Sequence, residues 1–162
     1  MNRRSVTARM SAATACFLAL TIRQTCYAEE LPAKYQAAAN RGLEWLAKQQ
    51  QRDGHWETHG QFHSAMTAMA GIDLLMEGST MREGKYRLNI RRAVDYLVAH
   101  ANHNGLIGDP KGANQGLGYL YGHGFSILFL SQLIGEEDDL ERRAQLEDLL
   151  NRAVDFTCKA QT

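Results

Sequence analysis

From Pro32 onward, apolar residues recur at the three- and four-residue spacing of a helix face, and no alternating stretch is long enough to predict a strand. The pattern therefore predicts an all-α protein. Glycine, proline and asparagine stand at the ends of the apolar runs, where they start turns or stop helices. The predicted helices cover Pro32–Gln51, Phe62–Glu77, Leu88–Asn102 and Tyr119–Ile134, with a last one from Asp138 or Asp139 to the C-terminus.

Three of these helices contain the same short pattern of a base, a tiny residue, an aliphatic residue, an acid and an aromatic residue. The copies begin at Arg41, Arg92 and Arg152, at intervals of 51 and 60 residues. Each interval leaves room for one helical hairpin with its connections. The second helices of the hairpins also align, since residues 64–78 and 121–135 are both apolar and both end in glycine. The sequence predicts tandem helical-hairpin repeats.

The first copy continues into a longer motif that ends in Gly-x-Trp. Its residues stand at the spacing of the QW repeat of squalene and oxidosqualene cyclases, and the chain from about residue 37 resembles the terpenoid cyclase and protein prenyltransferase superfamily. The second copy has Ala101 and Ile107 where the repeat has Gln and Trp, and the third has Thr157 in place of Leu. The matching residues are Arg41, Gly42, Trp45, Leu46, Gln50, Gly54 and Trp56 in the first copy, Arg92, Ala93, Tyr96, Leu97 and Gly105 in the second, and Arg152, Ala153, Phe156 and Gln161 in the third.

This resemblance implies a partial α/α toroid of about two and a half hairpins. In the first copy we expect structural roles for the motif. Trp45 and Leu46 should lie on the packed side of the helix, and Gly54 should permit the turn that follows. Gln50 should satisfy open carbonyls at a helix end, while Trp56 should cover that end.

Neither catalytic constellation of the superfamily is found in the sequence. The acidic cluster Glu136–Asp139 does not reproduce the Asp-rich acid motif of the cyclases, and we expect it to stabilise a helix start. No Asp-x-Cys precedes Cys158, which we expect to pack in the core, so the zinc ligands of prenyltransferases are not matched. The sequence favours a non-catalytic binding or scaffolding module without a cofactor. The alternative is an N-terminal piece of an isoprenoid cyclase or prenyltransferase.

Three histidines, His55, His59 and His63, recur every fourth residue. On a continuous helix they would share one face and could hold a metal ion, with Glu57 as a further ligand or base. Gly54, just before His55, and Gly60, just after His59, interrupt such a helix. We therefore interpret the stretch as a polar turn rather than as a metal site.

The N-terminal region differs from the rest of the chain. Residues 1–28 carry four arginines and no acid, with an apolar stretch at residues 12–22. This is typical of a signal peptide, here cleaved after Ala28, although an N-terminal membrane anchor is the alternative. We expect an exported repeat domain at residues 29–162 without a membrane span. Its partners would be the rest of a toroid, a second copy or an apolar isoprenoid-like ligand. Because 18 basic residues balance 18 acidic ones, no nucleic-acid partner is expected.

Overall fold

The computed structural model describes residues 32–108 and 118–161. The chain divides into two units, Met1–Gln36 and Ala37–Thr162. The predicted signal peptide, residues 1–28, lies outside the described residues. In the first unit the described part is the beginning of helix α2 (Ala33–Lys48), where the carbonyl of Pro32 accepts a hydrogen bond from the backbone N–H of Tyr35 at 2.8 Å.

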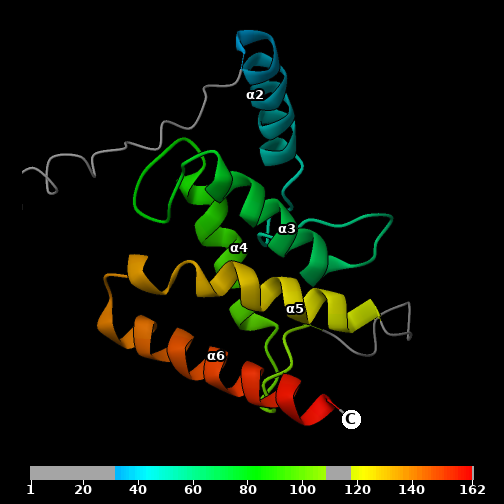
Figure 1. The fold of residues 1–162 in the computed structure, drawn as a ribbon, viewed down its shortest axis with the longest axis vertical. Helices are drawn as coiled ribbons and strands as arrows, with labels where there is room; N and C mark the ends of the chain where they lie inside the picture. The colour runs from blue at the N-terminus through cyan, green and yellow to red at the C-terminus, as the bar shows by residue number, and fades with distance from the viewer. Residues whose placement is uncertain (1–31, 109–117, 162) are drawn as a thin grey trace, which may run out of the picture. The chain divides into compact units, whose positions relative to one another are not determined.

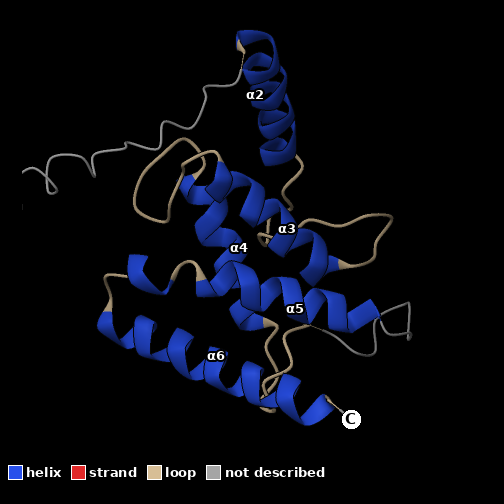
Figure 2. Cartoon of the chain, viewed as in Figure 1, coloured by secondary structure: helices blue, strands red, loops and turns tan. Residues whose placement is uncertain are grey.

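All regular structure in the described residues is helical (Figure 2). No strand forms within residues 32–108 and 118–161, where the only β-type pairing is two isolated bridges. The all-α prediction is confirmed, and every predicted helix is present. The helices are α2, α3 (His63–Met76), α4 (Arg87–Ala99), α5 (Gly118–Ser131), a short 3-10 helix η1 (Ile134–Glu136) and α6 (Leu140–Ala160).

The first and third helices end earlier than predicted. Their predicted last residues, Gln51 and Asn102, belong instead to turns. The backbone N–H of Gln51 donates to the carbonyl of His55 at 2.8 Å, and that of Asn102 donates to the carbonyl of Leu106 at 2.7 Å. The two turns lie at corresponding places in two repeats. The turn that follows the motif, rather than the spacing of apolar residues, therefore determines where α2 and α4 end.

Helices α3 and α5 pack more closely than any other pair of described helices. Small residues make this approach possible. A Cβ atom at Gly71 would lie 2.5 Å from ring atoms of Phe129, and one at Gly122 would lie 3.3 Å from the backbone nitrogen of Ala65. Helix α4 packs on α3 and α6 on α5, and Figure 1 shows α5 and α6 running side by side in opposite directions. The core thus lies around the α3–α5 pair, and α4 and α6 close it with buried residues of their own.

The segments that the sequence predicts to be consecutive repeats, called repeats below, contact one another through a glycine. Gly54 follows α2 with a φ of +101°, and a Cβ atom there would lie 2.3 Å from the carbonyl oxygen of Arg92 in α4. Gly105 follows α4 with a φ of +94°, and a Cβ atom there would lie 2.1 Å from the carbonyl oxygen of Arg152 in α6. Only glycine fits both the left-handed backbone and the close approach. The same contact therefore joins the first repeat to the second and the second to the third.

The residue two positions after each of these glycines is buried. Trp56 is 3% exposed and Ile107 is fully buried. The backbone N–H of Trp56 donates to the Thr67 hydroxyl at 3.0 Å, and that of Ile107 donates to Nδ1 of His123 at 3.1 Å. The Trp56 indole N–H also donates to the carbonyl of Leu46 at 2.8 Å, as expected for a side chain that covers the end of α2. The degenerate second copy keeps this arrangement with Ile in place of Trp.

Two expectations about side-chain burial are wrong. Trp45 does not lie on a packed side, because 63% of its surface is exposed, whereas its counterpart Tyr96 is 6% exposed. Tyr96 is covered by the loop of the preceding repeat, and no described segment covers Trp45 in that way. Cys158 is also exposed rather than in the core, since it lies on the outer side of α6.

The acidic cluster stabilises a helix start, as predicted. Asp139 is the N-cap of α6, and its carboxylate accepts from the backbone N–H groups of Glu141 and Arg142. Glu136 accepts from the backbone N–H of Met81 at 2.8 Å and so ties the α3–α4 connection to this corner. Within the part of the chain that the structure describes, no helix is long and apolar enough to cross a membrane.

Candidate metal centre

A tight turn shapes the loop between α2 and α3. Thr58 and Gln61 form a two-residue hairpin, with backbone hydrogen bonds of 3.1 Å and 2.9 Å between them. The central residues His59 and Gly60 have φ angles of +50° and +71°, as in a type I′ turn. Phe62, the N-cap of α3, is also left-handed, with a φ of +57°. The chain therefore reverses, and the residues before and after the hairpin come together.

This reversal brings His55, Glu57 and His63 into one cluster. Their ligand atoms all lie within 4.8 Å of one another. Nε2 of His63 is 3.2 Å from Oε2 of Glu57, and Nε2 of His55 is 3.6 Å from the same oxygen. The two imidazole rings face each other, with centroids 4.6 Å apart. Two imidazoles and a carboxylate are a ligand combination that zinc takes in proteins.

The two imidazole Nε2 atoms have no hydrogen-bond partner among the described residues, although both atoms are buried. The carboxylate of Glu57 is within ion-pair range of them but lacks hydrogen-bond geometry. Buried polar atoms without a partner are rare in proteins, because each one costs free energy unless water or an ion satisfies it. Both atoms point into the cluster, where a metal ion would give each nitrogen a partner.

Asp53 orients the first of these histidines. Its carboxylate lies 2.6 Å from Nδ1 of His55. Partial burial raises the pKa of Asp53, but hydrogen bonds from the His55 side chain and backbone outweigh it and hold this pKa below its usual value. In a neutral His55 ring, the charged Asp53 favours the proton on Nδ1, and the lone pair of Nε2 then faces the cluster. Carboxylates fix metal-binding histidines in the same way.

Aromatic rings cover the other side of His55. The ring of Tyr96 lies 5.0 Å from that of His55, and His100 stacks on Tyr96 at 4.0 Å. The ring nitrogen Nδ1 of His100 is 2.8 Å from the carbonyl of Tyr96. Because Tyr96 and His100 belong to the second repeat, the cluster lies at a junction between repeats, and its first ligand is held from both sides.

The repeat fold itself does not require these ligands. The positions that correspond to His55 and Glu57 in the second repeat, 51 residues later, are Leu106 and Gly108. Although it has Leu106 and Gly108 at these positions, the second repeat still forms the same turn and the same glycine contact. A polar ligand set is therefore an addition to the first repeat, and packing alone does not explain it.

The sequence interpretation of this stretch is partly right. The stretch is a turn and not a helix, as predicted, and His59 is exposed, with its Nδ1 only 3.1 Å from the Thr58 hydroxyl. The turn nevertheless unites His55 and His63 with Glu57, the residue expected as a further ligand. Sequence reasoning missed Asp53, and the pattern Asp-x-His-x-Glu was its only signal.

The residues of the QW-like motif lie outside this cluster and make structural contacts. Gln50 donates through Nε2 to the carbonyls of Gly54 and Asn89, which ties the first turn to the start of α4. Arg152 reaches back to the carbonyls of the second turn at Asn102 and His103. Among the other motif positions, Ala93, Leu97 and Ala153 are buried, Leu46 and Phe156 are half-buried, and Arg41, Gly42, Arg92 and Gln161 are exposed. The Phe156 ring lies edge-on to the ring of His123.

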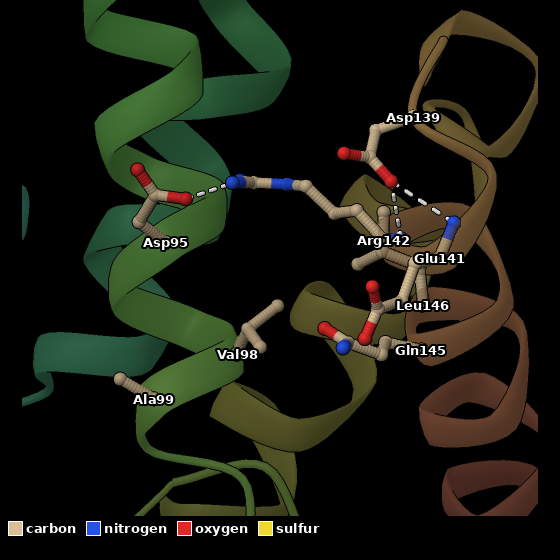
Figure 3. Close-up of a pocket in the computed structure, with 8 residues that line it drawn as sticks. All are labelled: Asp95, Val98, Ala99, Asp139, Glu141, Arg142, Gln145 and Leu146. Carbon is tan, nitrogen blue, oxygen red and sulfur yellow. Dashed lines mark hydrogen bonds and ion pairs between the residues drawn. The ribbon is translucent and has the colours of Figure 1, made fainter.

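A cavity of about 430 Å³ lies between α4 and α6 (Figure 3). Three of its polar side chains already have partners. Arg142 reaches across it to form an ion pair with Asp95, and Asp139 caps α6. The other lining residues drawn in Figure 3 are Val98, Ala99, Glu141, Gln145 and Leu146. Because Arg142 and Asp95 pair with each other and Asp139 caps a helix, this cavity has fewer groups arranged toward one ligand than the histidine cluster does.

Comparisons with known proteins found no relative. No family model matches the sequence, and neither a curated protein nor a solved structure matches it. The resemblance to cyclase and prenyltransferase repeats therefore rests on the motif residues alone.

Proposed function

We propose that this protein is an exported helical-repeat module that binds one divalent transition-metal ion through His55, Glu57 and His63. The observation that carries the proposal is the pair of buried Nε2 atoms, which lack a hydrogen-bond partner among the described residues and converge with a carboxylate oxygen within 4.8 Å. The hairpin repeats serve as its scaffold. They fix the loop through the Gly54 contact and cover His55 with Tyr96.

The ligand set favours zinc over magnesium or calcium. Imidazole nitrogen suits zinc, copper, nickel and iron, whereas magnesium and calcium prefer oxygen ligands. Two of the three donors here are imidazole nitrogens. Zn²⁺ also accepts the distorted tetrahedral arrangements that a short loop provides, because its filled d shell imposes no geometry of its own.

Two parts of the proposal, export and a binding role, rest on features of the sequence. The basic start and apolar stretch at residues 1–28 support export, and the missing Asp-rich motif supports a module without cyclase chemistry. The second candidate function is that of a piece of an isoprenoid cyclase or prenyltransferase. It is favoured by exposed apolar side chains on the closely packed helices α3 and α5, namely Met69, Met76, Tyr121 and Leu128, which further hairpins of a toroid could cover.

Zinc binding to the full chain tests the proposal. Isothermal titration of metal-free protein with Zn²⁺ should show one site. The variant His63→Ala should weaken it by at least about 100-fold, which exceeds the loss typical of outer-shell changes. The matched control is His59→Asn, in the same turn, because asparagine tolerates its left-handed φ of +50°. Equal zinc affinity in wild type and His63→Ala, or equal losses in both variants, would refute this assignment.

A further inference from the structure

The metal centre is open on one side. All three donors come from the nine-residue segment 55–63, so they approach the ion from one short stretch of chain. The side chain of His55 is 14% exposed, that of Glu57 is 35% exposed and that of His63 is 40% exposed. Tyr96 therefore closes the His55 side, while the Glu57 and His63 side adjoins solvent.

This geometry differs from that of a structural zinc site. Structural sites surround the ion with four protein ligands and exclude solvent, whereas sites with three protein ligands keep a position for water or substrate. Glu57 and His63 are the more exposed of the three side chains, so such a position would lie on their side of the cluster. An outside ligand there would bind directly to the ion, and the second-repeat aromatics would not obstruct it.

We propose that a metal ion at this centre holds a water molecule in an exchangeable position and that a small anion can replace it. The inference rests on the proposed metal binding and adds the class of ligand to it. Glu57 and the charged Asp53 behind His55 together balance the two positive charges of the ion, so an anion such as a carboxylate would be held by direct coordination to the ion rather than by a net charge of the centre.

Cobalt absorption spectroscopy of the full chain tests this inference. Co²⁺ replaces Zn²⁺ at nitrogen and oxygen sites, and its visible bands respond to each change of ligand. Azide is the probe because it binds through one atom and does not chelate the ion. Perchlorate at the same ionic strength is the control, since it coordinates metal ions only weakly. We expect azide, and not perchlorate, to change the bands of the Co²⁺ protein in a saturable way.

The variants and outcomes separate the two proposals. His59→Asn should keep the azide response, and His63→Ala should lose the cobalt spectrum altogether. If one equivalent of Co²⁺ binds and azide leaves its bands unchanged, the open position is refuted while metal binding stands. If the wild type retains no Co²⁺ or Zn²⁺ on equilibrium dialysis, metal binding itself is refuted and the open position falls with it.

Discussion

His123 is a buried imidazole whose two nitrogens have different partners. Nδ1 accepts from the backbone N–H of Ile107 at 3.1 Å, so it carries no proton. Nε2 then carries the proton and lies 3.1 Å from the hydroxyl of Thr157, which itself donates to the carbonyl of Ala153. The neutral ring thus links the second turn, α5 and α6. Protonation of Nδ1 would place an N–H donor opposite the N–H donor of Ile107. Two donors cannot form a hydrogen bond with each other, so the ring or the turn would have to move.

We predict that His123 makes the protein less stable in acid. Burial lowers the pKa of His123, with a smaller opposite effect from a backbone hydrogen bond with Ala153. The unfolded chain therefore binds more protons below its own histidine pKa of about 6.5, and stability is lost as pH falls through that value. The variant His123→Asn keeps an acceptor for Ile107 but cannot titrate. Its melting temperature should fall less than that of wild type between about pH 7.5 and about pH 5.5, which brackets this pKa. Parallel pH profiles for the two proteins would contradict the prediction.

Among the elements, the turn after α2 and the turn after α4 decide how consecutive repeats pack against each other. Its glycine has a left-handed backbone and lies against the carbonyl of the next repeat's arginine, at Gly54 and again at Gly105. The sequence suggested the turn because glycine follows each apolar period. It did not indicate the close approach, because the partner carbonyl lies 38 residues away at Arg92 for the first turn and 47 residues away at Arg152 for the second.

We predict that Gly105→Ala lowers the free energy of unfolding by about 2–5 kcal/mol, as the sum of a left-handed penalty and an overlap with the Arg152 carbonyl. The control is Gly78→Ala. Gly78 has a φ of +103°, but its Cβ would meet nothing within 4 Å among the described residues. Gly78→Ala should therefore lower the free energy of unfolding only by the backbone penalty of about 1–2 kcal/mol. Urea unfolding of both variants measures the difference, and equal losses would show that the close contact contributes nothing.

For the molecule as a whole, each repeat completes the burial of the next. Tyr96 in the second repeat is buried under His55 of the first, and Phe156 in the third lies against His123. Trp45 holds the same motif position in the first repeat but is mostly exposed. The same motif position therefore has a different environment depending on whether a described copy of the motif precedes it. A repeat architecture would produce this dependence on the neighbouring copy.

This difference predicts unequal costs for equivalent substitutions. In metal-free buffer, Tyr96→Ala should lower the free energy of unfolding by about 3–5 kcal/mol, as for other large buried side chains. Trp45→Ala should cost less than about 1 kcal/mol, because exposed positions contribute little. Chemical denaturation gives both values. Similar costs at the two positions would mean that Trp45 is covered in solution by a segment or partner outside the described contacts.

The sequence by itself determined the helices and their number in the described region. The spacing of apolar residues, the glycines that end helices and the acidic cap at Asp139 are local properties. Each can be recognised from a short segment of sequence. The glycines beside the histidines correctly indicated a turn, but the spacing alone could not show that this turn brings His55 and His63 together with Glu57.

Tertiary structure decided the rest. The left-handed backbone at His59 and Phe62 folds the loop back on itself, and only this reversal unites His55 and Glu57 with His63. The burial of Tyr96 and the exposure of Trp45 likewise depend on which segment lies next to each ring. These features rest on contacts between residues that are not helical neighbours, and no periodic pattern records such contacts.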